Sequence, residues 1–284
     1  MGASVLPARP LANKGPRMTN SWAAALITLF LWWFSTGAIL WRVRHADRAG
    51  GAAHQTSVLL GLPLLLGGIW GFGVSIDDAT TPGTYLAFLS ALAIWGWIEL
   101  AFLSGVITGP NTDPCPPFAR GWDRFRRATL TILWHEVALI LALVLLGYAT
   151  WTEANPFGFY TFGLLFFARL SAKLNLFFGV PRIHTEFLPR PLSHLASHFR
   201  HARMNWVFPI SITLLTFATG CWLERAFSAE TEAARIGHIL LAALTALALR
   251  EHWFMVLPLP DQKLWRWMLP ASPASAPNPP ATRQ

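Results

Sequence analysis

Charged residues are scarce in this chain of 284 residues, at 13% of the sequence. A soluble domain of this size carries about 25% charge, so the scarcity excludes an ordinary water-soluble globule. Cysteine is rarer still, because the chain has 2. Cys115 lies in a proline-rich segment and Cys221 lies inside an apolar run. This placement provides neither a disulfide framework nor a metal motif.

Several motifs of common enzyme classes are also missing. The sequence has no P-loop GxxxxGK[ST], no GxGxxG after a strand, no GxSxG and no HExxH. These absences argue against nucleotide-driven transport and serine hydrolysis. No soluble basic domain is present to hold a nucleic acid. We therefore interpret the formal net charge of +8 as the excess of Lys and Arg that sets the orientation of a membrane protein.

Long apolar runs are what the chain does have, with 54% hydrophobic residues, 15 Trp and 20 Phe. A hydrocarbon layer of about 30 Å needs roughly 20 helical residues to cross it. The sequence therefore predicts an all-α, polytopic membrane bundle of about seven transmembrane helices with short interfacial helices. The seven predicted spans are residues 21–41, 57–76, 84–107, 128–151, 157–179, 206–224 and 235–257.

Lysine and arginine are distributed unevenly between alternate loops. Fourteen lie on one side of the seven spans and five on the other. Because loops rich in these residues stay in the cytoplasm, the count predicts an external amino terminus and a cytoplasmic carboxyl terminus.

The membrane domain is expected to cover residues 18–269. Residues 1–17 precede Met18, which is followed directly by the first span, and we interpret them as an extension upstream of the true start. Residues 270–284 are rich in proline, alanine and serine, a composition typical of disorder.

The second span is rich in glycine and contains Pro63. Small residues let helices approach closely, so we expect a tight helix contact or a kink here rather than a substrate path. The glycines are Gly61, Gly67, Gly68, Gly71 and Gly73.

Two loop segments have the pattern of interfacial helices. Residues 118–127 alternate aromatic and arginine side chains, which suits an anionic membrane surface. Residues 192–203 have a leucine and phenylalanine stripe, and His194, His198 and His201 stand at i, i+4 and i+7. On an α-helix these three histidines would share a face.

Ionisable residues recur about one to two turns inside four predicted spans, near the basic side. Such residues are costly in a membrane and tend to mark function. One interpretation is a structural network of ion pairs in which acids and bases neutralise one another. The residues of this layer are Glu99, His135, Glu136, Arg169, Lys173, Arg250, Glu251 and His252.

A second interpretation adds the histidine-rich loop, with His184, Glu186, His194, His198 and His201, as a site for iron, manganese or zinc. A histidine-rich layer on the cytoplasmic side of a helical bundle resembles that of membrane di-iron desaturases. Only His194 and His198 have a spacing close to that of the desaturase histidine boxes. A third makes His135 or His252 an axial ligand of a chlorin magnesium or haem iron. The metal-ligand candidates are His135, Glu136, His184, His194, His198, Glu251 and His252.

Four segments carry a resemblance to a known family: LWWFSTG at 31–37, KLNLFFGVPRIHTEFLP at 173–189, SHFR at 197–200 and MNWVFP at 204–209. With them the chain resembles the photosynthetic complex assembly proteins of purple bacteria called PuhE, over about residues 18–269. The resemblance carries over no catalytic residues.

This resemblance implies an inner-membrane factor that helps to assemble the reaction centre and its light-harvesting ring, or that influences their bacteriochlorophyll supply. Its expected partners are the lipid bilayer and photosynthetic subunits or other assembly factors. We expect residues 180–205 to be the main contact region. The alternatives are a metal-dependent enzyme with a cytoplasmic-side site and a transporter, which needs a cavity reaching the charged layer.

Overall fold

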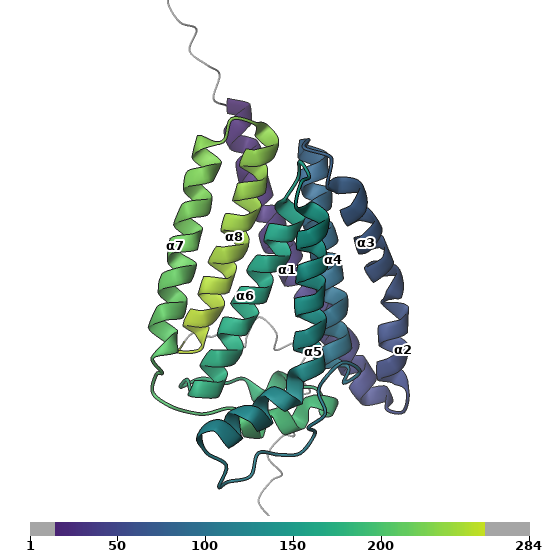
Figure 1. Ribbon diagram of the computed structural model, residues 1–284, viewed down its shortest axis with the longest axis vertical. Helices are drawn as coiled ribbons and strands as arrows, with labels where there is room; N and C mark the ends of the chain where they lie inside the picture. Colours follow the sequence, from purple (N-terminus) through teal and green to yellow (C-terminus); the bar gives the residue numbers. More distant parts are fainter. Residues whose placement is uncertain (1–14, 259–284) are drawn as a thin grey trace, which may run out of the picture.

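The structure is a computed structural model that describes residues 15–258. Over these residues it is an all-helical bundle, and the predicted fold class is confirmed. Residues 1–14 and 259–284, with most of the proposed extension and the proline-rich tail, lie outside the described part. The elements (Figure 1) are α1 Gly15–Ala49, α2 Ala53–Leu60, α3 Leu62–Ser75, α4 Thr81–Leu103, α5 Gly121–Thr150, α6 Phe157–Phe178, η1 Thr185–Phe187, η2 Arg190–His198, α7 Val207–Ser228 and α8 Glu232–Phe254.

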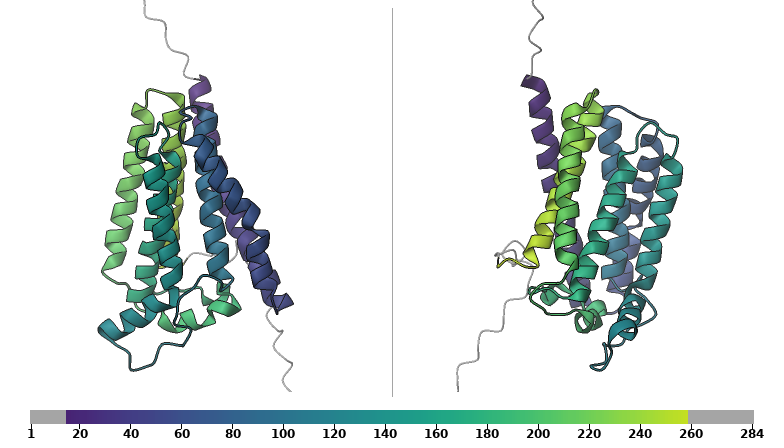
Figure 2. Two further views of the ribbon diagram at one scale, coloured as in Figure 1. Left: turned by 45° about the vertical axis from the view of Figure 1, so that its right-hand side comes forward. Right: turned by 60° about the vertical axis from the view of Figure 1, so that its left-hand side comes forward.

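Within residues 15–258, seven helical segments are long and apolar enough to cross a membrane, with α2 and α3 together making one of them. Helices α4 and α8 are the most buried. α8 packs against α1, α4 and α7, while α4 also packs against α3 and α6. Figure 2 shows the long α1 along one side of the bundle. Large side chains such as Trp70 and Phe217 point outward, which gives the helices a surface for lipid.

The second span is broken where its sequence predicts. α2 ends at Leu60 and α3 begins at Leu62, with Pro63 in its first turn. The indole of Trp97 donates a hydrogen bond of 3.1 Å to the Val58 carbonyl next to this break. Further along, a Cβ on Gly71 would lie 2.5 Å from the Ser90 hydroxyl of α4. The span was expected to have a tight helix contact or a kink, and the structure shows the tight contact, together with an interruption between α2 and α3.

The two ends of the bundle differ in charge. We call the end where α1, α4, α6 and α8 finish the basic end, because the arginine-rich connections lie there; it is at the bottom of Figure 1. The opposite end carries the short connections that contain Asp77, Asp78 and Glu153. Hydrogen bonds with Thr80 lower the pKa of the Asp78 carboxyl, and the Thr80 hydroxyl in turn accepts a hydrogen bond from the Gly83 amide, which caps α4.

Both predicted interfacial segments differ in detail from their sequence patterns. The first is helical from Gly121, but it continues into α5 without a break. The second contains η2, a 3₁₀-helix that ends at His198, so the α-helix expected over 192–203 is wrong. An α-helix joins each amide to the carbonyl four residues earlier, whereas the Leu192 amide here bonds to the Pro189 carbonyl, three residues earlier, at 3.0 Å.

Candidate functional site

Three residues of the predicted polar layer meet between α4, α5 and α6. The carboxylate of Glu99 lies 3.2 Å from the Arg169 guanidinium and 3.7 Å from Nε2 of His135. Glu99 is buried, and His135 is fully buried with its ring stacked on Phe102 at 4.2 Å. A buried carboxylate needs such a partner because an unpaired charge in a low dielectric is costly.

A second ion pair joins α5 to α6 one turn away. Lys173 pairs with Glu136, and its ammonium also lies 5.7 Å from the centre of the Phe102 ring. Arg169 and Lys173 are four residues apart on α6, so both point to the same side of that helix. The two ion pairs of α6 therefore lie in successive turns of the helix. Each base neutralises one acid, as expected for a structural network of ion pairs.

The two α8 charges lie outside this pairing. The Arg250 guanidinium lies over the Trp32 ring of α1 at 4.8 Å and near Phe254 at 5.3 Å, contacts that stabilise a cation in a dry environment. Glu251 faces a cavity and is exposed to it. Its charge interacts with Arg169 and Arg250, and its side chain is hydrogen bonded with Trp32.

His252 has both ring nitrogens in use. Nε2 lies 2.9 Å from the Ser171 hydroxyl, and Nδ1 lies 2.8 Å from the Ala248 carbonyl one turn earlier on α8. Nδ1 therefore donates its proton to the carbonyl, and Nε2 accepts from the hydroxyl. This buried histidine joins α8 to α6, and the arrangement leaves it no nitrogen for a metal or pigment.

The cavity beside the layer has a volume of about 580 Å³, within the range of small-molecule sites, roughly 300–1,000 Å³. Its wall is mostly aliphatic and aromatic, and Glu136, Arg169, Lys173 and Glu251 form a polar strip on it. A cavity therefore reaches the charged layer. Its aromatic lining residues are Trp32, Phe102, Phe125, Phe177, Phe187, Phe199 and Phe254.

Residues 180–205, which we call the capping segment, close the cavity from the basic end. Leu192 and Leu195 are buried against Phe102. The Arg182 amide donates to the Met255 carbonyl at 3.1 Å, and the Arg190 amide donates to Asp47 at 3.1 Å. The expected contact region is thus largely a lid packed on the bundle, with only part of its surface exposed.

The loop histidines do not form the predicted stripe. In a 3₁₀-helix each residue turns by about 120°, so His194 and His198 point in different directions. His201 follows the end of η2 and lies in an isolated bridge with Val180. His184 pairs with Glu186 instead, at 3.1 Å.

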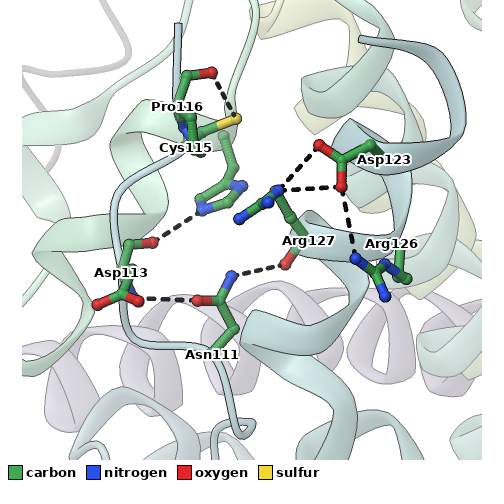
Figure 3. Close-up of polar contacts among 8 residues, drawn as sticks. Asn111, Asp113, Cys115, Pro116, Asp123, Arg126 and Arg127 are labelled. Atoms are coloured by element: carbon green, nitrogen blue, oxygen red, sulfur yellow. Dashed lines mark hydrogen bonds and ion pairs between the residues drawn. The ribbon is translucent and has the colours of Figure 1, made fainter. Parts of the chain in front are cut away.

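His198 has a structural role that its sequence position did not indicate. It is buried, and burial lowers the pKa of its imidazole. Nε2 donates to the Asp113 carbonyl at 3.2 Å, so the capping segment is attached to the connection between α4 and α5. Figure 3 shows how Asn111 continues this contact to Arg127 of α5, with Asp123 holding the Arg127 side chain.

Within residues 15–258, no group of three or more histidine, cysteine, aspartate or glutamate side chains is arranged to hold a metal ion. In the buried layer Glu99 lies near His135, and the other charges near Glu99 are Arg169 and Lys173. Two cations beside a donor pair oppose a third positive charge. The geometry therefore gives the metal interpretation no support.

Two asparagines of the family-like segments were not recognised as functional from the sequence. Asn205 accepts bonds from the amides of Val207 and Phe208 at 2.8 and 3.0 Å, which caps α7. It also donates to Gly179 at the end of α6, at 2.7 Å. Fully buried Asn175 donates to Ser211 at 2.9 Å. The capping preference of asparagine before an apolar run is the signal that identifies Asn205.

The comparisons with known proteins agree with each other over most of the chain. A family model described as "Protein of unknown function (DUF3623)" matches residues 18–276. A protein of Rhodobacter capsulatus, described as an uncharacterized 30.4 kDa protein in the puhA 5′ region, is 65% identical over 254 residues, which are 89% of this chain and 93% of that protein. No solved structure matches. The chain therefore belongs to the DUF3623 family.

Proposed function

We propose that this protein is an inner-membrane assembly factor for the photosynthetic reaction centre and its light-harvesting complex. The observation that carries the proposal is the relative described by its place in the puhA 5′ region. The resemblance to the PuhE family points to the same role. The geometry of the layer agrees with binding and positioning rather than catalysis, because buried Glu99 and half-buried Glu136 are each neutralised by a base.

The cavity supports a role in handling an amphipathic molecule such as bacteriochlorophyll. Its aromatic walls suit a flat apolar ring, and its polar strip suits the oxygen substituents at a ring edge. The predicted axial ligands do not fit, since His252 has two protein partners and His135 is buried behind Phe102. A pigment would therefore be held by stacking and by polar contacts at its edge.

Deleting the gene in its host tests the proposal. We expect assembled photosystem per cell to fall while respiratory growth continues, and the gene on a plasmid to restore the photosystem. The measurement is the near-infrared absorbance of reaction centre and antenna in isolated membranes. Unchanged absorbance in the deletion strain would overturn the assembly role.

We further propose that the basic end faces the cytoplasm. The support is the excess of lysine and arginine in the connections at that end. Reporter fusions after Ile76, at the opposite end, should be active outside the cytoplasm, and a fusion after Gln284 should be active inside it. Activity on the reverse sides would overturn this orientation.

A further inference from the structure

A groove separate from the cavity lies on the outside of the basic end. It is formed by the first turns of α5, the end of α6 and Arg200 of the capping segment, and its volume is about 700 Å³. The apolar segment of α6 that is long enough to cross a membrane ends at Phe178. The groove is therefore at the depth where lipid headgroups meet the hydrocarbon layer.

The groove is positively charged. Arg120, Arg124 and Arg200 line it, and no carboxylate from residues 15–258 does. The neighbouring Arg126 and Arg127 differ, because both pair with Asp123, at 3.5 and 2.9 Å. Proteins rarely place three cations together without a counter-ion, since like charges repel.

Arg124 is held in place without being neutralised. Its guanidinium donates to the Phe177 carbonyl at 3.0 Å and to the His198 carbonyl at 2.7 Å, and it lies 4.2 Å from the centre of the Phe177 ring. These partners carry no net negative charge. The guanidinium is thus fixed at the floor of the groove while its charge remains available to an anion.

Aromatic side chains lie in the groove and beside it. Trp122 is 74% exposed and Phe118 is 77% exposed. Phe178 lines the groove and packs against Trp206 at 5.6 Å. A soluble anion gains nothing from this apolar surface, whereas an acyl chain gains contact along it.

We propose that the groove binds an anionic phospholipid, with the phosphate between Arg120, Arg124 and Arg200 and an acyl chain along Trp122 and Phe178. The charge of the site matches the phosphate, and its depth and apolar wall match the chain of the same molecule. This site is distinct from the cavity, and it does not depend on the proposed function.

The test compares two double variants that remove equal charge from the same end. Arg120→Gln with Arg200→Gln changes two exposed groove residues and leaves the anchored Arg124 in place. Arg48→Gln with Arg203→Gln changes two exposed arginines outside the groove. Delipidated protein in detergent is titrated with phosphatidylglycerol or phosphatidylcholine, and native mass spectrometry counts the bound lipid.

We expect wild-type protein to prefer phosphatidylglycerol, and the groove variant to lose affinity for it by about tenfold or more, because each basic residue near a lipid surface contributes about 1 kcal/mol. The control variant should keep most of its affinity. A photoreactive phosphatidylglycerol should also label wild-type residues 117–124 and Phe178, which line or border the groove and not the cavity. This measurement does not depend on how a variant folds.

Several outcomes would overturn the proposal. Equal losses in both double variants would indicate diffuse attraction to the whole basic end. The absence of a preference for phosphatidylglycerol, or labelling elsewhere, would show that the groove is not a lipid site. Displacement of the lipid by an equal concentration of inorganic phosphate would make it a general anion site, and tighter binding of an acidic peptide would make it a protein-docking site.

Discussion

The two ends of this bundle are built from the same helices by different means. At the opposite end the helices are joined by close contacts and neutral hydrogen bonds. Asn155 donates to the carbonyls of Ser75 and Asp78 at 3.0 and 2.9 Å. Gly237 brings α8 so close to α6 that an added Cβ would lie 2.3 Å from the Phe157 ring.

At the basic end the helices are separated by charged side chains and by the cavity. Glu99 with Arg169 connects α4 to α6, and Glu136 with Lys173 connects α5 to α6, beside the cavity. Close packing at one end thus holds the bundle together, and the other end has room for a site. Three substitutions test this difference between the two ends.

The largest effect is expected for Glu99→Gln at the basic end. The change leaves Arg169 without its carboxylate, which costs about 3–5 kcal/mol for a fully buried pair. Because the Arg169 side chain is 39% exposed, we expect a smaller loss of about 2–3 kcal/mol in the free energy of unfolding. Denaturation in mixed detergent micelles measures it.

Glu224→Gln is the matched control for this change, since Glu224 is exposed on α7. It should alter the unfolding free energy by less than about 0.5 kcal/mol. The double variant of Glu99→Gln with Arg169→Gln should lose less than the two single losses combined, because the partners are coupled. An effect of Glu99→Gln no larger than the control would contradict a structural ion pair.

A moderate effect is expected for Gly237→Ala at the opposite end. The new methyl group meets the Phe157 ring, and overpacking of this kind costs about 1–3 kcal/mol. Gly73→Ala is the control, because no atom lies within 4 Å of its added Cβ, and alanine favours helix by up to about 1 kcal/mol. If both variants unfold alike, close packing is not what holds the opposite end.

The smallest effect concerns pH at the opposite end. Hydrogen bonding with Asp77, and repulsion from its charge, raise the pKa of Glu153. The folded state therefore binds this proton more tightly than the unfolded state, and stability is lost as the pH rises from the ordinary glutamate pKa through the raised value. Glu153→Gln should remove that loss.

Melting temperatures of wild type and Glu153→Gln across pH 4 to 7 check this expectation. As the pH rises, the melting temperature of the variant should increase relative to that of the wild type. The difference should be small because Glu153 is fully exposed. A constant difference across this range would show that Asp77 and Glu153 do not interact.

Much of the fold was predictable because it depends on quantities that can be counted along the sequence. Span length and hydropathy predicted seven crossings, and counting turns predicted that Glu99, Glu136, Arg169 and Lys173 lie at similar depths. Which acid meets which base depends on the rotation of each helix about its axis. That rotation is set by packing, as where Gly71 meets Ser90, and the apolar pattern of a buried span does not specify it.

The capping segment was predicted least well. Its histidine pattern fits an α-helical period, but residues Arg190–His198 form a 3₁₀-helix, which changes where each side chain points. The cavity exists because Leu192 and Leu195 fold back onto Phe102, a long-range contact without a local sequence signal. The cap at Asn205 had such a signal and was predictable.

We propose that the cavity wall at the basic end carries the function, apart from its part in stability. Glu251 tests this best, since it faces the cavity and is exposed to it. Glu251→Gln keeps the shape of the side chain and removes its charge. His201→Gln, at an exposed position of the capping segment, is the control.

The direct measurement is photosystem absorbance in a deletion strain complemented with each variant, with the variant protein quantified in the same membranes. We expect the Glu251→Gln protein to accumulate to wild-type levels but to restore much less reaction centre and antenna than the His201→Gln protein does. Full restoration by Glu251→Gln at normal protein abundance would contradict it.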